Sequence, residues 1–508
     1  MKRIFPVIFL SILFFLPISC KKSTNGKITD NEFEECDIKD PLEVQIRDTV
    51  FYYTKLFSLW QEYMPPRKVD DILDPDVVQR HARKFCSGEE VLDFMMGLTP
   101  LFEGKPVDRY SFLDRTQEVS DEIQKGVASS YGLYLFYLSS DGQDADLHVR
   151  MVDKGSPAYL AGIRRGARIY SMNGKTNLGY SQQLSKNFKD VNEALSSENL
   201  DIEFQNPEES KKEVDIQNTR FDLDPLLADT VYTIDNHKIG YFAYNSFINV
   251  GVPGNRNAFY NQLEAMFTQF ENEHINELIV DLRYNGGGSV LTAEYLANRL
   301  VPTSAAGGLM YENKVNAVLE DWGWTEPGDV FPPVYFTPEG NLDLSRIYFL
   351  VSDNTASASE LLINVLKPYM DVKMVGVYGG ADASNNPVPK NTYGKPVGFF
   401  GYPIVNEDIE LYVTSFQMLN KNKEGDYFGG LVPDDHAFES FFKDFGDPEE
   451  QLIEAALNHI SLGDFTPMAM RKRAGLQPLQ RDKSISLKDF GKDDRRNNMY
   501  KFFTERKL

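Results

Sequence analysis

NTASASELLINVLKPYM, residues 354–370, is the stretch that decides the fold. It follows RIYFLV (346–351), a short apolar and β-branched run that is typical of a buried strand. Its apolar side chains then recur at helical spacing, at Leu361, Leu362, Val365 and Leu366. The stretch therefore places a cluster of hydroxyl side chains at a strand-to-helix turn, beside backbone N–H groups that lack partners at a helix start.

This serine cluster has two interpretations. Ser357 and Glu360 match the pattern S-x-x-E, in which the serine hydroxyl caps the helix and does nothing further. A serine at such a turn is also well placed to act as a nucleophile, because the neighbouring N–H groups can stabilise an oxyanion. Capping signatures are common, so the choice between the two depends on the rest of the chain.

The segment around this turn alternates strand and helix patterns. HKIGYFAYNSF (237–247) is strand-like, and residues 257–275 have the apolar spacing of an amphipathic helix. Residues 275–301 continue with strand, glycine turn and helix, and VKMVGVYG (372–379) begins another strand. This alternation predicts parallel crossover units, whose sites form at the carboxyl ends of the strands.

A second turn, DLRYNGGGS (281–289), contains three consecutive glycines after a buried-looking strand. Glycine permits a positive φ and lets a substrate approach the backbone, so that aligned N–H groups can face an oxyanion. A phosphate site or a plain tight loop would fit the glycines equally well. The G-x-x-x-x-G-K-[ST] spacing of a P-loop is absent from the turn.

A third piece, NTYGKPVG (391–398), places Lys395 in an otherwise apolar stretch. Burial lowers the pKa of a lysine, which can then act as a general base for a serine. Such a Ser-Lys pair is a known variant of the Ser-His-Asp triad. A solvated surface lysine is the alternative interpretation.

Together these motifs resemble the C-terminal processing peptidases, also called tail-specific serine proteases. The resemblance rests on four motifs in order, which are DLR-x-N-x-GG at 281–288, S/T-A-S-A-S-E at 355–360, T-x-G-K at 392–395 and GGLVPDD at 429–435. With the segment that precedes them, it covers roughly residues 40–460. It implies an α/β multidomain protein with a crotonase-like ββα catalytic domain over residues 221–462.

The resemblance also implies roles for single residues. Ser357 is the expected nucleophile, with Ser359 and Thr355 as less favoured choices, and Lys395 is the expected general base. The oxyanion hole is expected from the backbone N–H groups of Gly287 or Gly288 and of Ala358. Phe399 stands where the family often has a glutamine, so a partner that orients the lysine must come from elsewhere or be absent.

Residues 127–216 have a strand-like, glycine-punctuated pattern, and the run GSPAYLAGIRRGARIYSMNGK (155–175) resembles a PDZ domain. PDZ domains bind a polypeptide C-terminus as an added strand and hold its carboxylate with backbone N–H groups. The resemblance places that loop at Tyr131 to Tyr134, with Gly132, Leu133 and Tyr134 as peptide-binding residues. A structural spacer is the alternative.

The N-terminus has the pattern of an export signal. MKRIFPVIFLSILFFLPISC (1–20) has a basic start, an apolar run too short for a comfortable membrane span, and a small residue before Cys20. It resembles a bacterial lipoprotein signal, which implies removal of residues 1–19 and lipidation of Cys20. Ordinary secretion is the alternative, and both place the mature protein outside the cytoplasm. Polar residues 20–41 would form a flexible tether.

A small helical domain is expected over residues 42–126, with its first helix running over 42–64 to Pro65-Pro66, and a basic extension over 463–508. The formal charge of -22 argues against a nucleic-acid partner. The six histidines show no metal-ligand spacing, and we expect neither a metal nor another cofactor. Cys36 and Cys86 could pair in an oxidising compartment, but we favour unpaired thiols.

These patterns favour a lipid-anchored serine endopeptidase with a Ser-Lys dyad, located in the cell envelope on the periplasmic side of the outer membrane or on the cell surface. Its expected partners are polypeptides with apolar C-termini and the membrane that holds the anchor. A peptide- or apolar-ligand-binding lipoprotein without turnover is the alternative on the same scaffold. A purely structural lipoprotein would explain the tether but not three convergent turns.

Overall fold

The computed structural model describes residues 35–139, 144–381, 387–406, 408–465, 485–490 and 499–501. The predicted signal, Cys20, most of the tether and most of the extension after residue 463 lie outside these residues. Within the described ranges, no helix is both long and apolar enough to cross a membrane.

The sheet that carries the serine turn has four parallel strands at its centre, in the order β12-β15-β19-β20. These strands are β12 (His237–Tyr244), β15 (Glu277–Asp281), β19 (Arg346–Val351) and β20 (Asp371–Ala381). The outer strands are antiparallel β11 (Leu226–Ile234), antiparallel β21 (Pro387–Pro389) and parallel β24 (Asp435–Ala437). The predicted alternation of strand and helix is confirmed.

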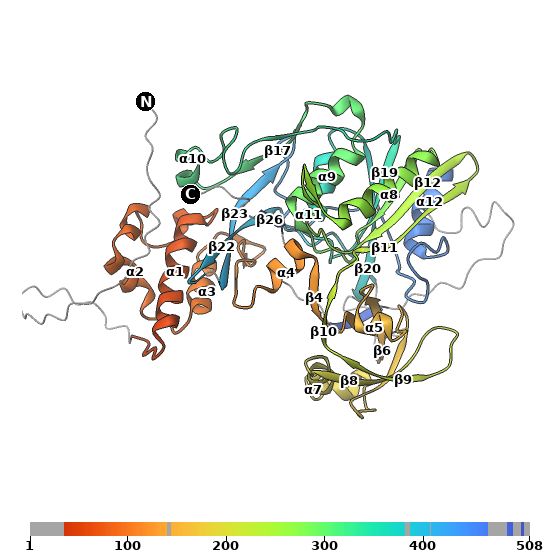
Figure 1. The fold of residues 1–508 in the computed structure, drawn as a ribbon, viewed down its shortest axis with the longest axis horizontal. Coiled ribbons are helices and arrows are strands. Elements are labelled where there is room, and N and C mark those ends of the chain that lie inside the picture. Colours follow the sequence, from red (N-terminus) through yellow and green to blue (C-terminus); the bar gives the residue numbers. More distant parts are fainter. Residues whose placement is uncertain are drawn as a thin grey trace, which may run out of the picture.

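Helices cover both faces of this sheet (Figure 1). One face packs against α8 (Ala258–Asn272), α9 (Val290–Leu300) and α11 (Ala358–Leu366), and the other against α12 (Gln451–Leu462). Successive residues of β12 face opposite sides, so that Phe242 and Tyr244 join the first core while Tyr241 and Ala243 join the second. Burial on both faces explains why these strands are apolar throughout.

A second sheet has the order β16-β26-β22-β23-β17-β18, with β3 paired to β23. Its long strands are β22 (Val397–Ile404) and β23 (Ile409–Leu419), and β22 begins two residues after Lys395. The shorter strands are β16 (Gly288–Ser289), β26 (Met499–Lys501), β17 (Leu309–Lys314), β18 (Val334–Tyr335) and β3 (Phe112–Asp114). The sheet therefore brings the glycine turn, the lysine segment and part of the C-terminal extension together.

The N-terminal helices α1 (Pro41–Phe57), α2 (Pro75–Ala82) and α3 (Gly88–Gly97) lie at the left of Figure 1. They share one hydrophobic core with the large sheet instead of enclosing a core of their own. Helix α1 ends earlier than predicted, because the Leu59 N–H donates to the Thr414 carbonyl of β23 (2.9 Å) and not to its own helix. A short 3-10 helix, η1 (Gln61–Tyr63), follows.

Cys36 and Cys86 form a disulfide, with their Cα atoms 5.3 Å apart. The preference for unpaired thiols was therefore wrong. Two cysteines separated by 50 residues give no sequence signal of contact, and only the fold of α1 to α3 brings them together.

A third, six-stranded sheet has the order β25-β5-β6-β7-β8-β9 and lies below the rest of the molecule in Figure 1. Its strands are β5 (Leu133–Ser139), β6 (Asp146–Val152), β7 (Arg168–Met172), β8 (Asn199–Gln205), β9 (Lys212–Gln217) and β25 (Ile485–Phe490). Short helices α5 (Pro157–Leu160), α6 (Tyr180–Leu184) and α7 (Lys189–Leu195) accompany it. The SPAYLAGI segment contains helix α5, and a tight turn follows β7 at Asn173 and Gly174, two residues with positive φ.

Smaller elements connect these units. Helix α4 (Glu118–Lys125) leads into β4 (Val127–Ser130), which pairs with β10 (Thr219–Asp222), so the chain enters and leaves the third sheet through one two-stranded ribbon. The remaining short elements are β1 (Leu101–Phe102), β2 (Lys105–Pro106), β13 (Gly251–Val252), β14 (Asn255–Arg256), α10 (Ala317–Asp321), η2 (Val69–Leu73) and η3 (Thr303–Ala305).

Candidate active site

Ser357 lies at the N-terminus of α11, on the turn that follows β19. Its backbone has φ 62° and ψ −112°, a conformation that residues other than glycine rarely adopt, and its side chain is fully buried. Such backbone strain costs about 1–3 kcal/mol and collects at functional sites. The sequence explains the position, since a buried strand and an apolar helix hold both ends of the turn.

Of the three candidate hydroxyls in this cluster, Ser357 is the one left without a hydrogen bond. Ser359 Oγ donates to the Asn285 carbonyl (3.0 Å), and Thr355 Oγ1 donates to the Leu282 carbonyl (2.8 Å). Among the described residues, Ser357 Oγ is buried and has no hydrogen-bond partner. Buried polar groups are nearly always paired, so the unpaired Ser357 hydroxyl on a strained turn requires an explanation.

The Glu360 carboxylate joins the serine turn to the lysine turn. Its Oε2 atom accepts hydrogen bonds from the backbone N–H groups of Ser357 and Lys395, both at 2.8 Å. Its Oε1 atom accepts from the Gly394 N–H (2.8 Å) and from the Thr392 hydroxyl. The capping interpretation therefore holds for the carboxylate, which accepts the hydrogen bond of the Ser357 N–H at the start of α11. Because both N–H groups donate to the same oxygen atom, the backbones of Ser357 and Lys395 lie close together.

Lys395 is fully buried in an aromatic environment. Its Nζ atom lies 3.8 Å from the ring centre of Phe399 and 4.6 Å from that of Tyr110. Burial lowers the pKa of Lys395 well below its usual value, and the negative charges of Asp108 and Glu360 oppose this shift only in part. Burial therefore favours the neutral form of the amine relative to an exposed lysine.

The glycine turn supports positive φ angles at Gly287 (107°) and Gly288 (134°). A Cβ atom at Gly288 would lie 2.5 Å from the Phe247 carbonyl oxygen, so this position requires glycine. The N–H of Gly287 donates to Asn285 Oδ1 (2.9 Å) and is occupied in this structure. Gly288, the other predicted position, lies opposite Met499 of β26 in the second sheet.

Two contacts tie the glycine turn to the serine turn. The Ala356 N–H donates to the Asn285 carbonyl (3.1 Å), which also receives the Ser359 hydroxyl. The N–H of Ala358, the first residue of α11, has no hydrogen-bond acceptor among the described residues, as expected at a helix start. That N–H is available to a substrate oxygen.

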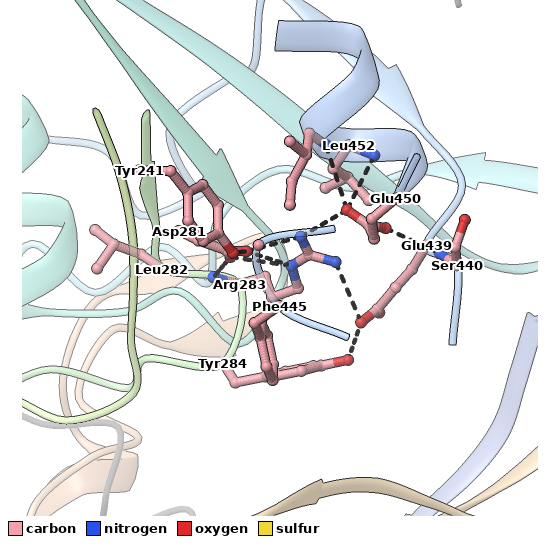
Figure 2. A network of polar contacts seen from close by, with 12 residues as sticks. Tyr241, Asp281, Leu282, Arg283, Tyr284, Glu439, Ser440, Phe445, Glu450 and Leu452 are labelled. Carbon is pink, nitrogen blue, oxygen red and sulfur yellow. Dashed lines mark hydrogen bonds and ion pairs between the residues drawn. The ribbon is translucent and has the colours of Figure 1, made fainter. Parts of the chain in front are cut away.

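Asp281 and Arg283, which precede the three glycines in the sequence, belong to a buried ionic network (Figure 2). Arg283 of the DLR motif contacts three carboxylates, with its Nη2 atom 2.7 Å from Asp281 and 2.8 Å from Glu450, and its Nη1 atom 3.5 Å from Glu439. The Tyr241 hydroxyl also donates to Asp281 (2.8 Å). Burial alone would raise the pKa of Glu439, but the charges of the surrounding arginines lower it to about 2. The arginine thus fixes the backbone just before the glycines.

The third sheet joins the same network through Arg165. Its Nη2 atom lies 2.6 Å from Glu439 Oε1, its Nη1 atom donates to the Tyr284 hydroxyl (3.1 Å), and its Nε atom donates to the Lys443 carbonyl (3.1 Å). All of these groups are buried or nearly so. One ionic cluster therefore holds the third sheet against the sheet that carries the site.

The predicted peptide-binding residues lie at the start of β5, away from the serine turn. The Gly132 N–H donates to Ser130 Oγ (3.0 Å), Leu133 is buried, and the Tyr134 hydroxyl donates to Asp153 Oδ2 (3.0 Å). Tyr134 lines a cavity together with Met151, Asn245, Tyr284, Gly286 and Asn354. Gly286 belongs to the glycine turn and Asn354 precedes the serine cluster, so the cavity lies between the loop and these two turns.

Sequence reasoning missed Tyr110 and Asp108 because their segment looked like a connection. The Tyr110 hydroxyl donates to the Gly394 carbonyl (3.0 Å), and Asp108 is buried among hydroxyl donors of Ser111 (2.7 Å) and Thr414 (3.0 Å). Tyr110 supplies one of the two rings around Lys395, and Phe399, which stands where the family often has a glutamine, supplies the other. Its only sequence signal is the aromatic and polar mixture of RYSFLD.

No cluster of three or more histidine, cysteine, aspartate or glutamate side chains that could hold a metal ion occurs in the described part of the chain.

The profile of peptidase family S41 matches residues 238–434, a range that contains the glycine, serine and lysine turns. No curated protein matches the sequence.

Among solved structures, an S41 protease from Bacteroides fragilis is similar over 81% of this chain and 97% of its own, with 23% identity and a TM-score of 0.56. The photosystem II D1 C-terminal processing protease is similar over 79% of this chain and 94% of its own (17% identity, TM-score 0.42). Mature CPAF complexed with lactacystin covers 78% and 94% (12% identity, TM-score 0.40). The first of these supports the fold, and the family match carries the assignment: residues 238–434 form a peptidase family S41 domain, the domain of a serine-type peptidase.

Proposed function

We propose that this protein is a serine endopeptidase in which Ser357 is the nucleophile and Lys395 is the general base. The observation that carries the proposal is the buried, unpartnered Ser357 hydroxyl on a strained turn. It is supported by Glu360, which accepts hydrogen bonds from the backbone of both residues, and by the burial that favours the neutral form of Lys395.

The reaction is an acyl transfer. Neutral Lys395 accepts the hydroxyl proton as Ser357 Oγ attacks the peptide carbonyl carbon, and the resulting oxyanion is stabilised by the N–H groups of Gly288 and Ala358. Collapse of this intermediate breaks the C–N bond, and the lysine proton passes to the leaving amine. Water then hydrolyses the acyl-serine with Lys395 again as the base.

The third sheet fits a role in substrate capture. We propose that it is a PDZ-like module whose loop at Gly132, Leu133 and Tyr134 receives polypeptides with apolar C-termini. The cavity lined by Tyr134, Gly286 and Asn354 supports this role, since it lies between the loop and the glycine and serine turns.

We further propose that the protein is a lipoprotein of the cell envelope, anchored through Cys20. The lipoprotein-type signal supports this location, and so does the Cys36–Cys86 disulfide, because such bonds persist in oxidising compartments outside the cytoplasm.

The test compares wild type, Ser357→Ala and Lys395→Ala on an unfolded protein with an apolar C-terminus, with product formation followed by gel electrophoresis and mass spectrometry. We expect cleavage by wild type and a loss of about 10³-fold or more in each variant. Cleavage that persists in both variants would remove the dyad. If all three proteins bind the substrate and none cuts it, the chain is instead a binding protein on a peptidase scaffold.

A further inference from the structure

Strand β25, from the C-terminal extension, lies on the outer edge of β5. The pairing is antiparallel, with Ile485 opposite Ser139 and Phe490 opposite Leu135. The other edge of β5 pairs with β6, so β25 fills the edge at which an extended polypeptide can add to this sheet.

The side chains of β25 are anchored as those of a bound ligand would be. Phe490 is 6% exposed and packs between the rings of Tyr137 (5.7 Å) and Phe188 (5.6 Å). Asp489 pairs with Arg150 of β6, with two nitrogen–oxygen contacts of 3.2 Å. One apolar pocket and one cationic site therefore recognise two adjacent residues of an added strand.

The direction of β25 is the one that substrate capture needs. Because Phe490 lies opposite Leu135, the strand runs toward the loop at Gly132 as its sequence advances. Asp489 and Phe490 also line the cavity that leads to Gly286 and Asn354.

A second piece of the same extension lies at the catalytic turns. Strand β26 inserts between β16 and β22, where Met499 pairs with Gly288, and Tyr500 pairs with both Ser289 and Phe399. Backbone from the extension thus lies beside the glycine turn on one side and beside the strand that follows Lys395 on the other. A substrate backbone that approached these turns would have to pair with the same two strands, β16 and β22.

We propose that the C-terminal extension occupies the protein's own substrate-binding site while it stays attached to the chain. Strand β25 lies on the free edge of β5, where a captured polypeptide would add, and β26 lies beside the glycine turn and the strand that follows Lys395. Free ligands compete with it, and the ligand class that fits is a polypeptide end with an aromatic residue preceded by an acidic one. The capture part stands on the β5 edge alone, whereas the effect on cleavage rests on the proposed function. Because a tethered segment acts at an effective concentration of the order of millimolar, it should weaken the binding of a free peptide by about tenfold or more.

The test measures binding of a fluorescent peptide, ISLKDF with a free carboxylate, by anisotropy. All proteins are full-length and carry Ser357→Ala, so the result is independent of turnover. The release variant adds Asp489→Arg and Phe490→Asp, which reverse the charge that meets Arg150 and place a charge in the apolar pocket. The matched control adds Lys488→Ala, since Lys488 is exposed on the same strand.

We expect the release variant to bind ISLKDF with a Kd at least about tenfold lower than that of the parent and the control. A second peptide, ISLKRD, should not bind to any of them. Equal affinity of the three proteins for ISLKDF, or equal affinity of the release variant for both peptides, would overturn the proposal. Circular dichroism of each protein verifies that the comparison is made on folded chains.

A separate arm restores Ser357 and measures cleavage of an unfolded protein. The release variant should cleave faster than wild type at low substrate concentration. If the binding result holds and no protein cleaves, the proposed peptidase function fails while the occupied edge stands. If cleavage occurs and binding is equal, the occupant proposal alone fails.

Discussion

At the scale of single residues, the site holds two features that oppose folding. An unsatisfied buried hydroxyl costs about 1–3 kcal/mol, and the positive φ of Ser357 adds a cost of similar size. Burying Lys395 in its neutral form adds to this. The four hydrogen bonds accepted by Glu360 offset part of the cost and hold the two turns in place.

The pKa of Lys395 leads to a prediction on pH dependence. Burial lowers this pKa, so the amine should lose its proton at a lower pH than an exposed lysine and should become protonated as the pH falls below its depressed pKa. Cleavage measured as kcat/KM from about pH 5 to about pH 9 should therefore decline on the acidic side. Lys395→Arg, which stays charged, should lose about 10²–10⁴-fold at every pH.

The control is Lys421→Arg, at an exposed lysine, which should retain both the rate and the profile. A flat profile down to acidic pH, or an active Lys395→Arg variant, would contradict the role of Lys395 as base.

Which residues could be predicted depended on how local their signal is. Ser357 and Lys395 stand in short motifs, and the structure places both on the Glu360 carboxylate. Tyr110 lies 284 positions before its hydrogen-bond acceptor, Gly394, and no short pattern links them. The hydrogen bond from the Gly287 N–H to Asn285 Oδ1 could not be predicted either, because it depends on the conformation of the Asn285 side chain.

At the scale of elements, the lysine turn depends on glycine. Gly394 has φ +85°, and a Cβ atom there would lie 2.4 Å from the Phe428 carbonyl oxygen. Gly394→Ala should therefore lower the free energy of unfolding by about 1–3 kcal/mol and shift the backbone that carries Lys395, so that kcat falls as well. Chemical denaturation and cleavage rates measure the two effects.

Gly97→Ala is the matched control, because a Cβ atom there would meet no atom within 4 Å. This variant should leave kcat unchanged and the stability equal or slightly higher. A stable and fully active Gly394→Ala protein would show that the lysine turn does not require glycine at this position.

Elements with strong apolar periodicity were predictable, including the parallel strands and α11. Element ends set by distant partners were not. Helix α1 stops at Phe57 because Thr414, far along the chain, accepts the Leu59 N–H. Strands β25 and β26 are short and pair only with distant strands, so the sequence near them shows no more than a basic, amphipathic tail.

At the scale of the whole molecule, the buried ionic network couples the third sheet to the site. Arg165→Ala would leave Glu439 with one of its two arginine ion pairs, and a broken buried pair costs about 3–5 kcal/mol. We expect a lower midpoint of thermal unfolding. We also expect a higher KM for substrates captured through the third sheet, since that sheet would be less firmly placed.

Arg168→Ala provides the comparison, because its ion pair with Asp146 is exposed and contributes little. Equal midpoints for the two variants would mean that the network does not hold the sheets together. The sequence could not predict this coupling, as its arginines and glutamates come from segments that are separated by more than a hundred residues and belong to different sheets.

The most direct test of the central claim is to trap the acyl-enzyme. A peptide ester substrate is mixed with wild-type protein, quenched in acid within the first turnover, digested and mapped by mass spectrometry. The account predicts one acyl group on Ser357, absent from Ser357→Ala and strongly reduced in Lys395→Ala. An acyl group on Ser359, Thr355 or another side chain, or turnover with Ser357 never modified, would contradict it.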